Sequence, residues 1–120
     1  MDMILEDVTQ VFRMAGFQQT HATKKVSEFT PSKSCGLIYL RKETGLPQAI
    51  RIVVAPDTKS AAFDHLEGVA LSNPGSFLHS SNMRSFPKRM HTGENSIPHG
   101  IQFTINSLTS LKEFLVIFCR

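Results

Sequence analysis

Two short apolar runs separated by a turn sequence constrain the fold of this chain more than any other feature. Residues 35–41 (CGLIYLR) and 48–55 (QAIRIVVA) are rich in aliphatic and β-branched residues, which favour strands. The intervening KETGLP holds Gly and Pro, which are typical of turns. The sequence therefore predicts a β-hairpin whose strands are covered on both faces for part of their length. Arg51 interrupts the second run, and we expect it to point to solvent or to a partner.

Amphipathic helices are predicted near both ends of the chain. Residues 3–16 place apolar side chains at helical spacing, and Gly16 is expected to end this helix. Residues 107–118 repeat the pattern, with Leu108, Leu111 and Leu115 on one face. Asn106 or Ser107 is expected to cap the second helix, because a side-chain oxygen there can accept a backbone N–H.

Weaker patterns fill the middle of the chain. Residues 18–31 are polar and hold either a short strand or nothing regular. Residues 58–67 suit a short helix, 69–71 and 76–80 suit short strands, and 101–105 alternate as a half-buried strand does. This order predicts one α+β domain over residues 1–120. In it, an antiparallel or mixed sheet of four to five strands packs against the N- and C-terminal helices.

Composition limits the setting in which the chain works. The formal net charge is +3, which is mildly basic, and 41% of the residues are hydrophobic, as in a globular protein. Cys35 and Cys119 are far apart, unlike the dense cysteines of small secreted scaffolds, so packing explains each and a reducing compartment is expected. The N-terminus lacks the basic region of a signal peptide. We therefore expect a cytoplasmic protein without a membrane segment.

The most distinctive polar stretch is residues 79–100, HSSNMRSFPKRMHTGENSIPHG. It has no clear hydrophobic period and is predicted to be a long basic loop within the domain; such loops are often functional. Its cations and amide or hydroxyl donors suit phosphate or carboxylate groups, and its aromatic rings suit stacking on a base. The predicted partner-binding residues are Arg51, His79, Ser81, Asn82, Arg84, Phe86, Lys88, Arg89 and His91.

Known catalytic patterns are not matched. His79, His91 and His99 are separated by 12 and 8 residues, so no two occupy adjacent turns of one helix, and no H-E-x-x-H zinc motif occurs. The sequence also has no glycine-rich phosphate loop and no nucleophile elbow. We therefore predict no metal and no cofactor.

These observations favour binding over catalysis. The leading hypothesis is a protein-interaction or regulatory module that contacts its partner through the basic loop. The first alternative is a nucleic-acid-binding protein that uses the same loop on phosphates. The second alternative is a small enzyme in which a loop histidine acts as general base.

Overall fold

The computed structural model describes residues 5–32, 35–42, 49–72, 77–79, 83–86, 88–90 and 96–119. The elements in chain order are α1 (Leu5–Met14), β1 (Phe17–Ala22), β2 (Val26–Pro31), β3 (Ile38–Arg41), β4 (Ile50–Val54), the 3-10 helix η1 (Ser60–Phe63), β5 (Val69–Leu71), β6 (Leu78–His79), β7 (Lys88–Met90), β8 (Ser96–Ile105) and α2 (Leu108–Phe118).

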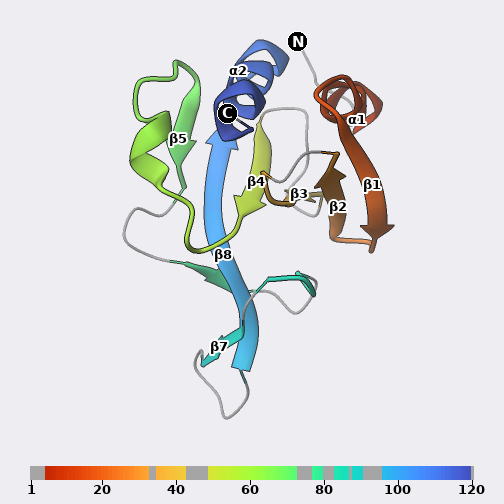
Figure 1. Cartoon of the computed structure of the whole chain (residues 1–120), viewed down its shortest axis with the longest axis vertical. Coiled ribbons are helices and arrows are strands. Elements are labelled where there is room, and N and C mark those ends of the chain that lie inside the picture. The colour runs from red at the N-terminus through yellow and green to blue at the C-terminus, as the bar shows by residue number, and fades with distance from the viewer. Residues whose placement is uncertain are drawn as a thin grey trace.

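The strands form an antiparallel sheet, which confirms the predicted fold class. Six strands follow the order β1-β2-β3-β4-β8-β5, one more than the upper end of the predicted range. The short strands β6 and β7 pair with the first half of β8, which runs along most of the long axis of the molecule (Figure 1). The predicted hairpin is β3 paired with β4, with Tyr39 opposite Val53.

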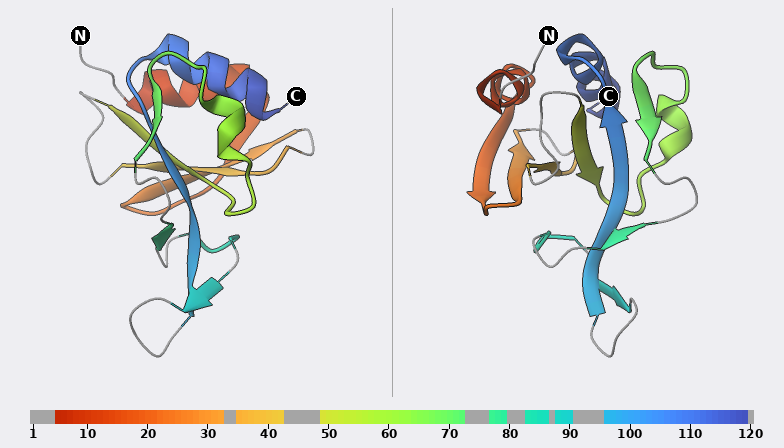
Figure 2. Two further views of the ribbon diagram at one scale, coloured as in Figure 1. Left: turned by 90° about the vertical axis from the view of Figure 1, so that its left-hand side faces the viewer. Right: turned by 180° about the vertical axis from the view of Figure 1, so that it is seen from behind.

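Both helices lie side by side on one face of the sheet, as the sequence predicts (Figure 2). The main core fills the space between them and the sheet. Phe12 of α1 stacks on Phe29 of β2 at a ring-centroid distance of 4.2 Å, and Phe114 of α2 stacks on Phe63 of η1 at 4.2 Å. All four rings are buried, so phenylalanine supplies much of the apolar surface that stabilises the fold.

The ends of the helices follow the predicted local chemistry. Gly16 has φ +92°, a backbone conformation that favours glycine, and α1 ends just before it. The Ser107 hydroxyl accepts the Ser110 N–H at 3.0 Å and so caps α2. Within the described residues, no helix is long and apolar enough to cross a membrane.

Two stretches with weak sequence patterns hold strands, which decides the open choice for residues 18–31 and corrects the long loop expected at 79–100. Residues 18–31 lie mostly in strands β1 and β2, although QQTHA reads as polar chain, because β1 is the outermost strand and exposes most of its side chains. The expected long loop at 79–100 contains β7 and the start of β8. Pro98 of β8 lacks an N–H, and in the described register it stands opposite Lys88 of β7.

The prediction of two separate packed thiols is also wrong. Cys35, just before β3, forms a disulfide with Cys119, which caps the C-terminal end of α2. Their Cα atoms lie 4.9 Å apart, within the normal range for a disulfide. The bond joins the helix layer to the sheet across 84 residues of sequence, a separation that gives no local signal.

Candidate functional site

The sheet face opposite the helices, here called the helix-free face, is defined by alternation along the strands. On β4, Ile50, Ile52 and Val54 belong to the core beneath the helices, so Arg51 and Val53 face the other way. On β3, the same alternation places Tyr39 and Arg41 on the helix-free face.

A four-residue turn covers part of the helix-free face. In this Met83–Phe86 turn, the N–H of Phe86 donates to the carbonyl oxygen of Met83 at 3.0 Å. Met83 is fully buried and Phe86 is 6% exposed, and both belong to a second apolar cluster on the sheet. The Phe86 ring meets Tyr39 edge-to-face at 4.9 Å. The turn is therefore packed onto the sheet rather than extended into solvent.

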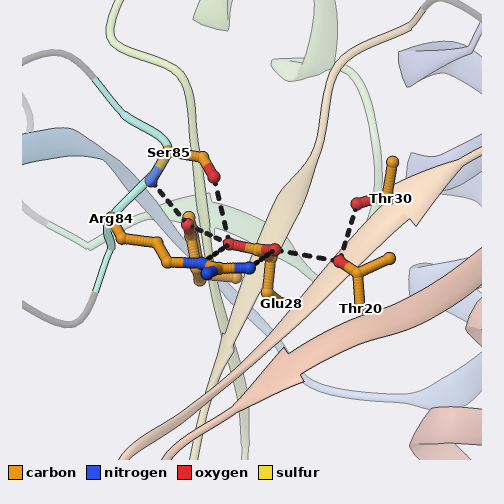
Figure 3. Close-up of polar contacts among 6 residues, drawn as sticks. Thr20, Glu28, Thr30, Arg84 and Ser85 are labelled. Atoms are coloured by element: carbon orange, nitrogen blue, oxygen red, sulfur yellow. Dashed lines mark hydrogen bonds and ion pairs between the residues drawn. The ribbon is translucent and has the colours of Figure 1, made fainter.

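Glu28 of β2 is the polar anchor of this turn (Figure 3). Its side chain is buried and accepts hydrogen bonds from Tyr39 Oη at 2.5 Å, Thr20 Oγ1 at 2.9 Å and Ser85 Oγ at 3.1 Å. Arg84 completes the group through an ion pair to Glu28 with Nη2–Oε1 at 3.3 Å. Because buried charges are stable only when they are paired and hydrogen-bonded, this network fixes the turn in place.

The charge states in the network are fixed near neutral pH. Burial alone raises the pKa of Glu28, but hydrogen bonds from Tyr39, Arg84, Thr20 and Ser85 outweigh it and lower that pKa from 4.5 to about 2. Burial, followed by the hydrogen bond to Glu28, raises the pKa of Tyr39 above its usual 10. A carboxylate and a phenol with pKa values this far from 7 are poorly matched to general acid–base catalysis. Near pH 7 the network therefore holds a Glu28 carboxylate and a neutral Tyr39 phenol.

Gly100 of β8 makes room for the turn. A Cβ atom at this position would lie 2.5 Å from the carbonyl oxygen of Val54, 2.6 Å from Val53 Cγ1 and 3.0 Å from Phe86 Cε2. We expect Gly100→Ala to lower the free energy of unfolding by about 1–3 kcal/mol through overpacking. Urea denaturation would measure this, and an unchanged midpoint would show that Gly100 does not lie this close to Val53, Val54 and Phe86.

Two predicted partner-binding residues are engaged within the protein. The Phe86 ring is buried against Tyr39 and is not accessible for stacking on a base, so that prediction is wrong. The Arg84 side chain is 56% exposed, but its guanidinium pairs with Glu28. The sequence gives no sign of this pairing because Glu28 lies 56 residues earlier.

The other residues predicted in the loop are placed in part. Lys88 and Arg89 lie in β7, and His79 in β6 stands opposite His99 in the backbone register. The His99 ring meets Phe77 edge-to-face at 5.2 Å. Ser81, Asn82 and His91 lie outside the described residues. Their predicted contacts with a partner, and the proposed histidine base, stay predictions.

Arg51 lies in a row of polar residues that crosses three neighbouring strands. Arg41 of β3 stands opposite Arg51 of β4, and Arg51 stands opposite Thr104 of β8. Arg41 Nη1 donates to Gln102 Oε1 at 2.5 Å, and the Thr104 and Ser72 hydroxyls share a hydrogen bond of 2.6 Å. We call Arg41, Arg51, Gln102, Thr104 and Ser72 the arginine row.

Two lysines extend the positive charge at the same end of β3. The N–H of Lys42, the residue after Arg41, donates to the carbonyl oxygen of Lys25 at 2.7 Å. Lys25, Arg41, Lys42 and Arg51 thus bring four cations to one end of the β2–β3–β4 strands. Glu43, the next residue in sequence, lies outside the described residues. Such clustering raises the local concentration of anionic ligands.

Sequence reasoning identified Arg51 but missed Arg41 and Glu28. Arg41 ends the first apolar run, and Arg51 interrupts the second. Two arginines in strands predicted to pair were the sequence feature that could have indicated Arg41. Their direct opposition depends on the hairpin register, which the turn sequence alone does not fix. Glu28 stands between Ser27 and Phe29 in a largely polar stretch, so no clear sequence signal indicated that its side chain is buried.

Comparison with known families and with curated proteins finds no match: the sequence matches no protein-family model and has no significant match among curated proteins. Within the described residues, no group of three or more His, Cys, Asp or Glu side chains is arranged to hold a metal ion. The arginine row is the candidate site because it brings two arginines together with hydrogen-bonding side chains on neighbouring strands.

Proposed function

We propose that this chain is a non-enzymatic binding module that recognises an acidic segment of a partner protein at the arginine row. The observation that carries the proposal is the direct opposition of Arg41 and Arg51 on paired strands. This register places the two arginines on adjacent strands of the helix-free face. A guanidinium can bind a carboxylate with two parallel hydrogen bonds, so the pair suits a segment that carries several carboxylates.

The neighbouring groups support the same reading. Both arginines are only half-exposed, so their charges are screened less by salt than those of fully exposed side chains. Gln102 and the hydroxyls of Thr104 and Ser72 add hydrogen-bonding groups beside them.

Binding of a labelled acidic peptide tests the proposal. The probe is a fluorescein-labelled twelve-residue peptide of alternating Glu and Gly, measured by fluorescence anisotropy at low salt. We expect Arg51→Gln to weaken binding about tenfold through loss of the paired hydrogen bonds. Arg13→Gln removes the same charge from an exposed position on α1 and should leave binding unchanged. Equal losses in both variants would mean that only net charge matters.

Nucleic-acid binding is the second candidate, and one observation favours it. β7, which carries Lys88 and Arg89, pairs with the start of β8 to form a two-stranded ribbon at the end of the molecule away from the helices (Figure 2). The DNA major groove admits a ribbon of this kind. Binding of labelled duplex DNA that weakens steeply between 50 and 200 mM salt, about as expected for several phosphate contacts, would favour this candidate.

A cytoplasmic location is part of the proposal, and the disulfide provides its test. Disulfides are rare in cytosolic proteins, where thiols are kept reduced. If the chain works in the cytoplasm, Cys35 and Cys119 should be trapped there as free thiols by an alkylating reagent added at lysis. Recovery of the oxidised form would instead point to an oxidising compartment.

A further inference from the structure

We infer that the outer face of α2 is an interface between two copies of this chain, which pack with their α2 helices side by side and parallel. This face lies across the sheet from the arginine row, so the inference does not rest on the proposed function (Figure 2). Its basis is an apolar groove flanked by two charges that are complementary to those of a second copy under two-fold symmetry.

An apolar groove of about 310 Å³ lies along the outside of α2. It is lined by Leu66, Lys112, Glu113, Val116 and Ile117, all within the described ranges 49–72 and 96–119. Val116 is 60% exposed, whereas Leu111 and Leu115 of the same helix are buried. Exposed apolar surface with a polar rim is typical of an interaction site, and its burial drives association.

Four exposed residues form one stripe along α2, at the three- and four-residue spacing of a single helix face. They are Thr109, Lys112, Glu113 and Val116. Successive residues of an α-helix are about 100° apart around the axis, so Thr109 and Val116 lie near the centre line of the stripe. Lys112 and Glu113 flank that line on opposite sides. The stripe thus has a cationic edge and an anionic edge.

The two edges select a parallel arrangement of the two helices. A two-fold axis parallel to the helices exchanges the edges, so Lys112 meets Glu113 of the second copy on one side and Glu113 meets Lys112 of the second copy on the other. An antiparallel pair would keep each edge on its own side and bring like charges together, which is unfavourable. In the parallel pair, Val116 packs against Val116 of the second copy.

Both charges are available for this pairing. Within the described residues, neither Lys112 nor Glu113 has an ion-pair partner in its own chain, and both side chains are exposed. They do not face each other, because sequence neighbours on a helix project in different directions. Exposed ion pairs contribute little affinity, so these charges set the orientation of the two copies. The apolar residues of the groove supply the contact area.

The mass of the protein in solution tests this inference. One helix face buries less than the roughly 800 Å² per partner of a stable complex, so we expect a weak dimer that depends on concentration. Sedimentation velocity at low salt, from about 10 μM to about 1 mM, covers the range of such an equilibrium. The average mass should rise from that of the monomer towards that of the dimer. A monomer mass throughout would overturn the inference and leave this face to a different partner.

Single variants assign the dimer to this face. Val116→Asp should weaken it at least tenfold, because a charge would enter the buried contact, and the domain should stay folded because Val116 is exposed. Glu113→Lys should weaken it about tenfold, because both symmetric ion pairs become repulsive. Asp57→Lys makes the same change of charge in the turn after β4, at the end of that strand away from α2, and should have no effect. Equal losses in the two lysine variants would overturn the inference.

Exchange of the two charges tests the parallel pairing itself. The double variant Lys112→Glu/Glu113→Lys restores opposite charges at the paired positions, so it should dimerise about as tightly as the wild type, unlike either single variant. A mixture of the Lys112→Glu and Glu113→Lys single variants should form a heterodimer, because one copy is then negative at both positions and the other is positive. A double variant as weak as the single variants would contradict the parallel pairing and overturn the inference.

Discussion

Replacing Cys119 with serine is expected to lower the free energy of unfolding by about 4–5 kcal/mol. The disulfide closes a loop of 84 residues, and a crosslink of that length removes much of the conformational freedom of the unfolded chain. A loss of this size is a large share of the total free energy of unfolding of a small domain, which is about 5–15 kcal/mol. Urea denaturation in non-reducing buffer measures it.

Reduction of the wild type is the matched control for this prediction. A thiol reductant should bring the wild type to the stability of the Cys35→Ser/Cys119→Ser double variant, and it should leave that variant unchanged. If the reductant has no effect on the wild type, the two thiols are not joined in solution, and the helix layer is held by packing alone.

Glu28→Gln is expected to lower the free energy of unfolding by about 3 kcal/mol at pH 7, from the shift of its pKa from 4.5 to about 2. The carboxylate form is the one stabilised by Tyr39, Arg84, Thr20 and Ser85. Because the pKa is depressed in the folded state, this stabilisation is complete above pH 4.5 and is lost as the pH falls towards 2. The stability curves of wild type and variant should therefore converge at low pH.

Glu113→Gln is the matched control, since it makes the same chemical change at an exposed position on α2. It should have little effect on stability at pH 7. Wild-type and Glu28→Gln curves that stay parallel from pH 7 to pH 2 would contradict the role of the Glu28 carboxylate as the anchor of the Met83–Phe86 turn.

Elements with local signals were predictable from the sequence. The β3–β4 hairpin followed from two apolar runs around a turn, and α2 followed from its leucine spacing and Ser107 cap. The missed features depend on contacts between distant residues. β1 is a polar edge strand, the first half of β8 pairs with the short strands β6 and β7, and the disulfide joins distant cysteines.

The candidate site was predictable only in part, for the same reason. Arg51 was identified because it breaks an apolar run. Its opposition to Arg41 needed the strand register, and its position beside Thr104 needed the pairing of β4 with β8. Arg84 and Phe86 read as a free cation and an exposed ring because their partners, Glu28 and Tyr39, lie far away in sequence.

Mapping the binding surface tests the central claim most directly. Backbone amide shifts of the isotope-labelled protein are followed by NMR as the acidic peptide of alternating Glu and Gly is added. The account predicts that the largest shifts fall on Arg41, Arg51, Thr104 and Ser72, with small shifts on α1 and α2. Shifts concentrated on the helices or on β7, with the arginine row unaffected, would contradict it.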